Sequence, residues 1–349
     1  MISEEEIEKI RIYLKKSENP LFFYDDDPDG LTSFLLLSKY IEKGKGIPVK
    51  SSPNMDSLYL RKIDEYSPDY IFILDKPFIS QDMVNKINVP VIWIDHHPLV
   101  DIKGINYFNP RKQNPEDSRP TSYWCYKVVR QNLWIAMCGI VGDWHAPEEE
   151  VDALIKEYPD LLKKTTSPGE ILFTTDFGRL IKIFAFLLKG STSNIKNNIS
   201  ILAKIENPYE ILQQTTSKGN YLYKYYLKIN KEYEALINKA RSSATSKNIL
   251  IFTYPTKSHS LTGYLANELL FNYPDKIIII GREKNDMTLM SFRSSSIPLP
   301  ELLQKALNGL EGYNGGHTHA CGGGIKKEQF HQFISNIKKE LKNQCPKNN

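Results

Sequence analysis

Apolar runs that end abruptly in acidic and histidine side chains dominate the pattern of the N-terminal part of the chain. The runs cover residues 20–24, 70–74 and 89–94, and they lead into Asp25-Asp26-Asp27-Pro28-Asp29-Gly30, Asp75 and Asp95-His96-His97, respectively. Their length and continuous apolar character are typical of buried strands. In an open α/β sheet, ligands bind outside the carboxyl ends of the strands. We therefore expect these acids and histidines to converge on one crevice at that edge of the sheet.

Strand and helix patterns alternate along the same part of the chain. Ser3 is a helix cap for a polar helix at the N-terminus, and residues 31–41 form a helical pattern directly after the acidic loop. The free N–H groups at the start of the second helix would face the crevice. Residues 121–143 form an apolar helical stretch, with a break expected at Gly139, that ends in Asp143. This alternation predicts an α/β protein with a mostly parallel sheet.

The pattern changes near residue 150. The following segment is rich in lysine, tyrosine and asparagine, contains helical stretches and lacks a strand pattern. Alternation then resumes, with strands expected at residues 248–253, 276–280 and 287–292 and helices at 261–271, 299–310 and 327–342. A glycine-rich segment at residues 313–324 allows close approach of the backbone to a ligand. We predict an α/β domain at residues 1–150, a helical connector at 151–245 and a smaller α/β domain at 246–349.

Composition and charge narrow the class of protein only slightly. The chain has 349 residues, a formal net charge of +4 and four cysteines. This charge permits a nucleic-acid partner without arguing for one. The cysteines form no C-x-x-C pair, so we expect reduced thiols in a cytoplasmic protein rather than a zinc knuckle. The N-terminus lacks the apolar stretch of a signal peptide, and no apolar run approaches the roughly 20 residues of a membrane span.

Carboxylate oxygens and imidazole nitrogens at the strand ends indicate a metal site. Such hard donors suit Mn²⁺ or Mg²⁺, and imidazole shifts the balance towards the transition metal. Each motif also has a structural interpretation when it is taken alone. The acids from Asp25 to Asp29 could form a turn and a helix cap, Asp75 could cap a turn at Pro77, and His96 and His97 could be core histidines.

The order of these motifs resembles that of the DHH phosphoesterase superfamily. The first four motifs of that family correspond to Asp25-x-Asp27-x-Asp29-Gly30, Asp75, Asp95-His96-His97 and Gly142-Asp143. The segment Gly315-Gly316-His317-Thr318-His319-Ala320-Cys321-Gly322 is similar to the glycine-rich motif of the DHH-associated C-terminal domain. The first motif begins with Asp25, whereas pyrophosphatases of the family carry a histidine there. The chain therefore resembles the RecJ-like branch, in particular the compact archaeal RecJ-like nucleases of the Hef-associated type.

This resemblance implies a site for two divalent ions, with Mn²⁺ preferred and Mg²⁺ as the alternative, in a cleft between the two α/β domains. By analogy with the family, Asp25, Asp27 and Asp75 surround one ion, and Asp29, Asp75, His96 and Asp143 surround the other. His97 would contact the scissile phosphate and Asp95 would orient a histidine. The C-terminal domain would hold phosphate or a terminal nucleotide through Arg293, Gly315, Gly316, His317 and Gly322. Asp26, His145 and His319 have no assigned role.

Three functions remain open at this stage. The favoured one is an exonuclease on single-stranded DNA or RNA in DNA repair or replication, with a Hef-type helicase as a candidate partner. The second is a hydrolase of short oligonucleotides or nucleotides, similar to nanoRNases and pAp phosphatases. The third is a non-catalytic replication-factor homologue, whose mark would be missing motif acids. Tyr221, Tyr223, Tyr225 and Tyr226 could stack on bases, although packing within the fold is the simpler interpretation.

Overall fold

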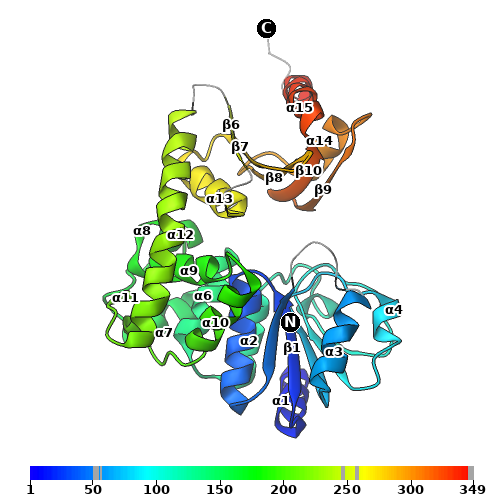
Figure 1. Cartoon of the computed structure of the whole chain (residues 1–349), viewed down its shortest axis with the longest axis vertical. Helices are drawn as coiled ribbons and strands as arrows, with labels where there is room; N and C mark the ends of the chain where they lie inside the picture. Colours follow the sequence, from blue (N-terminus) through cyan, green and yellow to red (C-terminus); the bar gives the residue numbers. More distant parts are fainter. Residues whose placement is uncertain (50–54, 56, 245–247, 256–258, 345–349) are drawn as a thin grey trace. The chain divides into compact units, whose positions relative to one another are not determined.

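The computed structural model describes residues 1–49, 55, 57–244, 248–255 and 259–344 (Figure 1). Their contacts divide the chain into two compact units, Met1–Lys224 and Tyr225–Asn349, which we call the N-terminal and C-terminal units. In the described part of the chain, no helix combines the length and the apolar character that crossing a membrane requires. Cys345 lies outside the described residues, and the other three cysteines are free thiols.

The N-terminal unit is built on a five-stranded parallel sheet, as the strand–helix alternation predicts. Its strand order is β2-β1-β3-β4-β5. The strands are β1 (Pro20–Asp25), β2 (Lys45–Val49), β3 (Tyr70–Leu74), β4 (Val91–Ile94) and β5 (Asn106–Phe108). The three apolar runs form the three adjacent strands β1, β3 and β4, so the prediction for each of them is confirmed.

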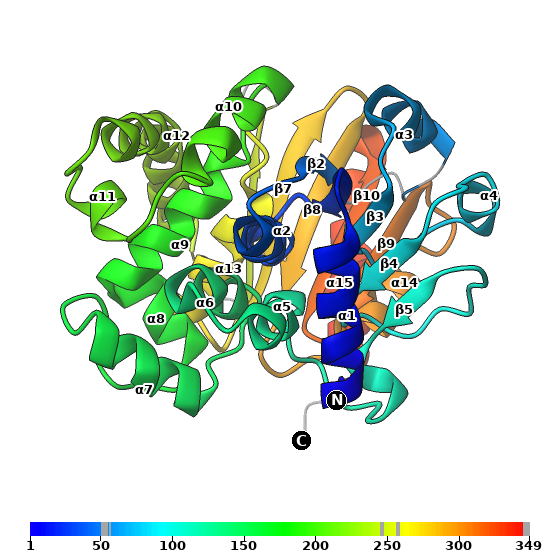
Figure 2. The same cartoon turned by 90° about the horizontal axis from the view of Figure 1, so that it is seen from below.

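Helices cover both faces of this sheet (Figure 2). On one face, Phe23, Ile73 and Trp93 pack in a buried cluster with residues of α3 (Leu60–Tyr66) and α4 (Gln81–Val84). The opposite face is covered by α2 (Pro28–Ile41), which lies against β1 and packs on α5 (Thr121–Val129). Burial on both faces explains why these strands are continuously apolar in sequence.

The N-terminal helix α1 (Glu4–Lys16) begins at Ser3, as predicted. The Ser3 side chain accepts a hydrogen bond from the backbone of Glu6, and the Glu6 side chain accepts one from the backbone of Ser3. This reciprocal arrangement is a capping box.

The apolar stretch from residue 121 to 143 is interrupted at a different position from the one we predict. It forms α5 and α6 (Leu133–Gly142), and the chain turns between them at Arg130 and Asn132, with left-handed φ values of 52° and 58°. Gly139 lies inside α6, where an added Cβ would lie 2.0 Å from Thr32 Oγ1. This glycine therefore allows close packing of helices rather than a break.

Between residues 148 and 242, all secondary-structure elements are helices. They are α7 (Glu148–Glu157), α8 (Pro168–Thr174), α9 (Asp176–Leu187), α10 (Thr192–Leu202), α11 (Tyr209–Leu212) and the long α12 (Ser217–Ser242). The border between the two units falls within α12. The predicted domain boundaries at residues 150 and 245 stay predictions, and residue 245 lies outside the described part.

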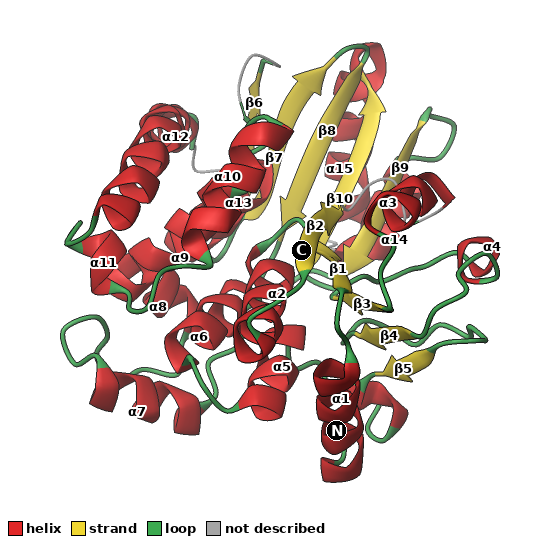
Figure 3. Cartoon of the chain, turned by 60° about the horizontal axis from the view of Figure 1, so that its bottom comes forward, coloured by secondary structure: helices red, strands yellow, loops and turns green. Residues whose placement is uncertain are grey.

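The C-terminal unit contains a second five-stranded sheet, in the order β6-β7-β8-β10-β9 (Figure 3). Its strands are β6 (Ile249–Tyr254), β7 (Ile277–Lys284), β8 (Met287–Arg293), β9 (Gly312–His317) and β10 (Ala320–Lys326). Only β6 and β7 pair in parallel, and the other neighbours are antiparallel. The three strands expected from the sequence are present, and the glycine-rich segment forms the hairpin of β9 and β10.

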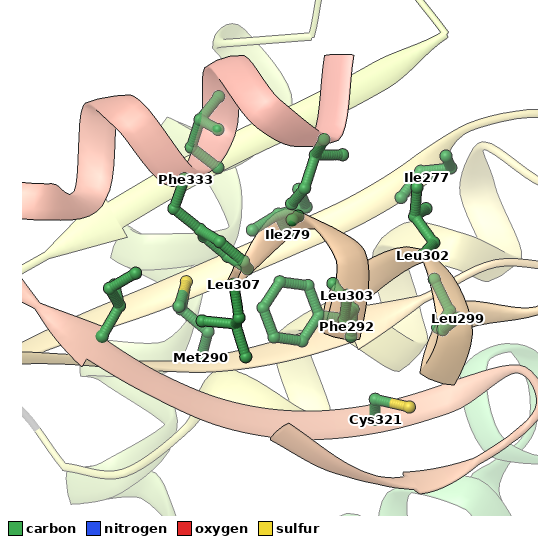
Figure 4. Packing of buried hydrophobic residues seen from close by; sticks show 14 residues of the cluster. Ile277, Ile279, Met290, Phe292, Leu299, Leu302, Leu303, Leu307, Cys321 and Phe333 are labelled. Atoms are coloured by element: carbon green, nitrogen blue, oxygen red, sulfur yellow. The ribbon is translucent and has the colours of Figure 1, made fainter. Parts of the chain in front are cut away.

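Helices also cover this second sheet. On one face, α14 (Leu299–Ala306) and α15 (Phe330–Gln344) enclose an apolar core around Met290, Phe292 and Phe333 (Figure 4). The remaining helix, α13 (Thr262–Asn272), packs on β7 and β8. Side chains alternate between the two faces of a strand. Ser291 and Arg293 therefore lie on the face of β8 opposite this core.

Candidate metal centre

The sheet topology creates a crevice where the predicted metal ligands lie. In the order β2-β1-β3-β4-β5, the chain leaves β1 towards one side of the sheet and leaves β3 towards the other. The adjacent carboxyl ends of β1 and β3 form the switch point at which such sheets bind ligands. Asp25 is the last residue of β1, and Asp75 directly follows β3. The sequence order of the elements thus places these two carboxylates beside each other.

The first motif combines a strand end with the first turn of α2. Asp27 caps this helix, and its Oδ1 accepts a hydrogen bond of 2.9 Å from Gly30 N. A Cβ atom on Gly30 would lie 2.6 Å from the backbone N and O of Asp25, so a side chain cannot be accommodated there. Glycine at this position lets the acidic loop fold back tightly onto the end of β1.

Asp29 joins α2 to the start of α5. Its two carboxylate oxygens accept hydrogen bonds from Thr121 N and Ser122 N, each 2.8 Å long. These are free backbone donors at a helix N-terminus, where negative charge is favoured. The carboxylate is buried and held in a fixed orientation. Each oxygen retains a lone pair that could bind a cation.

The structure brings all six predicted metal ligands together. Donor atoms lie within 4.8 Å of one another in three groups, which are Asp25–Asp27–Asp75, Asp29–His96–Asp143 and Asp75–His96–His97. Asp75 and His96 each belong to two groups and so link them into one centre. Oxygen donors with imidazole fit Mn²⁺ well and also fit Mg²⁺. Among the described residues, Asp26, His145 and His319 belong to none of these groups.

Burial and mutual repulsion disfavour ionised carboxylates in the absence of a cation. Burial, followed by the charges of neighbouring aspartates, raises the pKa of Asp27 and of Asp75 well above the usual range. Burial raises the pKa of Asp143 to about 6, although His96 acts in the opposite direction. A divalent cation would relieve this cost, which is a second reason to regard the group as a metal site.

His96 is oriented for binding through Nε2. This atom lies 3.4 Å from Asp75 Oδ1 and 3.6 Å from Asp143 Oδ2. Its Nδ1 lies 3.1 Å from the carbonyl oxygen of Ser118, which is the partner expected for a donating Nδ1–H group. Burial lowers the pKa of His96, but the carboxylates of Asp143 and Asp29 outweigh this effect and raise it overall.

Asp95 holds both the imidazole and the backbone of His97. His97 Nδ1 lies 2.8 Å from Asp95 Oδ1, and its backbone N donates a 3.0 Å hydrogen bond to Asp95 Oδ2. Asn109 Nδ2 donates to the same Oδ2 atom at 3.3 Å. Asp95 is completely buried, so this network fixes the imidazole ring beside the donor groups.

Several residues of the centre are absent from the sequence prediction. Thr121 and Ser122 hold Asp29, and Asn109 holds Asp95, but all three are distant in sequence from the acids that they contact. Lys76 is different, because it directly follows Asp75. Its Nζ lies 2.7 Å from Asp25 Oδ1, and the residue is only 1% exposed. Its position, directly after an apolar run and an acidic residue, would have allowed its place near the centre to be predicted from the sequence.

Four of the five predicted substrate-binding residues, Arg293, Gly315, His317 and Gly322, come together within the C-terminal unit, whereas Gly316 lies in the row of Cys321 and Phe292, whose side chains are in the core. Across the antiparallel strands, Ala320 pairs with Arg293 on one side and with His317 on the other. Gly322 likewise pairs with Ser291 and Gly315. Residues directly opposite each other share a face of the sheet, so these two rows form one surface.

Around Gly315 and Gly322, this surface has no side chains on β9 and β10. An added Cβ would meet nothing within 4 Å at Gly315, and at Gly322 only Met290 O at 3.8 Å. Gly316 has a φ of 136°, which L-residues rarely adopt. The Arg293 side chain donates to Asn267 Oδ1 at 2.5 Å and to Phe292 O at 2.9 Å, which are neutral acceptors. Burial lowers the pKa of Arg293 to about 10, so it stays charged at neutral pH.

Comparison with known proteins gives a family match in the C-terminal part of the chain and a similar fold over nearly all of it. The family model of the DHHA1 domain matches residues 247–343. RecJ from Thermus thermophilus in complex with Mn²⁺ is similar over 96% of this chain and 54% of its own, with 15% identity and a TM-score of 0.69. The structure of its complex with Mg²⁺ is similar over 96% of this chain and 52% of its own, with 15% identity and a TM-score of 0.61. A search of curated proteins gives no match.

An exonuclease RecJ structure bound to manganese matches over nearly the full length of both chains. It covers 97% of this chain and 94% of its own, with 14% identity and a TM-score of 0.56. In contrast, the present chain spans about half the length of the Thermus thermophilus protein. Residues 247–343 thus match the DHHA1 domain family, and the fold of the chain is similar to that of these RecJ structures.

Proposed function

We propose that the chain is a metal-dependent phosphodiesterase that acts as an exonuclease on single-stranded DNA or RNA. The observation that supports this proposal is the convergence of six side chains that could bind metal ions, from four separate segments, near the switch point of the parallel sheet. Metal ions in such a site bind phosphate groups, and the RecJ-like fold supports a nucleic-acid substrate. A Hef-type helicase as partner stays a prediction.

The donor groups would hold two divalent ions that share Asp75. One ion would bind Asp25, Asp27 and Asp75, and the other would bind Asp29, Asp75, His96 and Asp143. Bound there, the ions would act as Lewis acids on a phosphate group and on an attacking water. Mn²⁺ is favoured because imidazole is among the donors. The related Thermus thermophilus RecJ was crystallised with each of these two ions.

Side chains next to the proposed ions would orient the substrate. His97 shares a donor group with Asp75 and His96, and its Nδ1 is held by Asp95, so its Nε2 would be the atom that contacts the scissile phosphate. Asp95 fixes the orientation of that ring through two hydrogen bonds. This division of roles makes Asp95 a positioning residue and His97 a contact to the reacting group.

The C-terminal unit offers an anion-binding surface that fits a nucleotide. Arg293 presents a guanidinium whose hydrogen-bond partners are neutral, so its charge is available to a phosphate. The bare strands beside it leave room for a flat base or a sugar-phosphate backbone at Gly315 and Gly322. His317 lies in the same row as Arg293 and would be a further contact.

Two alternatives predict different substrates. A hydrolase of short oligonucleotides or nucleotides would use the same metal centre and differ only in substrate length. A non-catalytic replication-factor homologue would have lost metal-binding acids, whereas this chain retains the full set. The metal centre therefore favours an enzyme, and substrate length separates the first two functions.

End-labelled substrates test the proposal directly. We expect stepwise shortening of single-stranded DNA or RNA with Mn²⁺, weaker activity with Mg²⁺, and none with EDTA, because without the ions no Lewis acid would activate the phosphate group and the attacking water. Dinucleotides and pAp serve as comparison substrates. Preferred hydrolysis of these short substrates would favour the second function, and full activity in EDTA would contradict a metal-dependent mechanism.

A further inference from the structure

Lys76 is a charged residue at the centre to which no role has been assigned above. Lys76 is 1% exposed, and its ammonium lies 2.7 Å from Asp25 Oδ1. Its own carbonyl oxygen accepts a 3.0 Å hydrogen bond from the buried indole of Trp93. The preceding residue, Asp75, has a left-handed φ of 59°, which sets the direction in which the chain leaves β3. The lysine is therefore held in the crevice from both ends.

The Lys76 ammonium contacts one of the two proposed metal sites. Asp25 belongs to the donor group with Asp27 and Asp75, which is the proposed site of one ion. Within the described residues, Asp25 is the only predicted metal ligand that forms an ion pair with a lysine or an arginine. The other group, Asp29–His96–Asp143, contains the imidazole but no such cation. The two sites thus differ in the charge that each already contains.

A buried ammonium and a metal ion compete for the same carboxylate. Burying the lysine is costly unless it remains paired, so it cannot simply release Asp25. A divalent ion bound by Asp25 would be repelled by an ammonium that lies within hydrogen-bonding distance of the same carboxylate. A metal ion at the opposite side of the centre does not have to displace the lysine.

We propose that Lys76 controls occupancy of the second metal site, so that the centre binds one divalent ion tightly at Asp29, Asp75, His96 and Asp143. The second ion binds at Asp25, Asp27 and Asp75 only by displacing the Lys76 ammonium from Asp25. At low metal concentration, the ammonium takes the place of that ion as the positive charge beside Asp25 and Asp27. This inference rests on the proposed metal-dependent function and concerns the inequality of its two sites.

Manganese titration of the metal-free protein measures this inequality without requiring any substrate. Electron paramagnetic resonance counts free Mn²⁺, and it distinguishes a single bound ion from a spin-coupled pair bridged by a carboxylate. We expect one tight site per chain, a second site that is weaker by about tenfold or more, and a coupled signal only at high Mn²⁺. Two sites of equal affinity in the unaltered protein would overturn the inference.

A substitution with a matched control identifies the lysine as the cause. Lys76→Met should strengthen binding of the second ion by about tenfold or more, because the competing charge is gone. Lys86→Met removes an ammonium that pairs with Asp82 on the surface of the same unit, and it should leave both affinities unchanged. An unchanged second affinity in Lys76→Met would also overturn the inference.

Two further outcomes are informative. If Lys76→Met does not fold, Lys76→Gln retains a polar but uncharged side chain at the same position and should strengthen binding of the second ion in the same way. A protein that binds no Mn²⁺ at all would contradict the proposed function together with this inference. Two equal tight sites would contradict the inference alone.

Discussion

Asp75 is the residue on which the candidate metal centre depends most. It is 1% exposed, belongs to two of the three donor groups, and accepts a 3.3 Å hydrogen bond from Thr121 Oγ1. Its φ of 59° is rare for residues other than glycine, although aspartate and asparagine tolerate it. Strained backbone of this kind often occurs at functional sites. The carboxylate is thus placed by a costly local conformation at the point where both ions would meet.

Asp75→Asn should abolish metal-dependent hydrolysis while leaving the fold intact. Asparagine keeps the size and the left-handed conformation of Asp75 and removes one of several repelling charges. Residues that merely orient a ligand cost roughly 10–100-fold when altered, so loss of a shared ligand should exceed about 100-fold. Asp26→Asn is the control from the same part of the centre, because Asp26 is in no donor group. Equal losses for the two variants would show that we have assigned the first motif incorrectly.

Protons should compete with the metal at Asp143. Burial raises its pKa to about 6, so the folded protein retains this proton at a pH where an exposed aspartate is ionised. The contribution of Asp143 to stability is therefore greatest at acid pH and is lost as the pH rises through about 6. A metal needs the ionised form, so affinity should change in the opposite direction.

Calorimetric titration with Mn²⁺ tests this competition. Affinity in the unaltered protein should fall between about pH 8 and about pH 5, and the protonation of His96 acts in the same direction. Asp143→Asn should bind Mn²⁺ more weakly at neutral pH and show a shallower dependence on pH. An affinity that does not change with pH in the unaltered protein would argue against Asp143 as a ligand.

Among the elements, the central strands could be predicted from sequence because their apolar runs are continuous. β1, β3 and β4 are buried on both faces, so each gives a strong signal. The edge strands β2 and β5 could not be predicted in this way. β2 contains Gly46 and Pro48 and is partly exposed, and β5 has only three residues. Pairing with a neighbouring strand, rather than a local pattern, makes these segments extended.

The hydrogen bonds that hold the predicted ligands in place could not be predicted from the sequence either. Asp29 is held by the start of α5, which lies about 90 residues further along the chain. The identities of the predicted metal ligands follow from motifs, whereas the partners of Asp29 follow from how α2 and α5 pack. Long-range packing of this kind leaves no pattern in the sequence of either helix.

Gly30→Ala tests how tightly the element β1–α2 must turn. The new Cβ would lie 2.6 Å from the backbone of Asp25, so the acidic loop must shift. We expect a loss of about 1–3 kcal/mol in the free energy of unfolding, as for other overpacked sites, together with weaker Mn²⁺ binding. Urea denaturation and calorimetric titration provide the two measurements.

Gly315→Ala is the control for this substitution, since an added Cβ there meets nothing within 4 Å. Its free energy of unfolding and its Mn²⁺ affinity should remain close to those of the unaltered protein. If Gly30→Ala were equally harmless, the close approach of α2 to β1 would not be needed to form the centre.

At the level of the whole molecule, the two units provide different parts of the proposed function. The N-terminal unit contains all six predicted metal ligands, and the C-terminal unit contains Arg293, His317 and the open positions at Gly315 and Gly322. Each unit has its own apolar core. Substitutions on the surface of the C-terminal sheet should therefore leave the metal centre unchanged, which allows binding and chemistry to be separated by experiment.

Arg293→Ala and His317→Ala should retain Mn²⁺ binding and lose most activity on single-stranded nucleic acid. Contacts remote from the metals position the scissile bond of a polymer, and a small chromogenic phosphodiester does not use them. Hydrolysis of that small substrate should fall much less. Lys305→Ala is the control, because it removes an exposed positive charge that pairs with Glu301 on α14. Equal losses on both substrates would place Arg293 and His317 in the chemical step, and no loss on either would mean that the C-terminal unit does not hold the substrate.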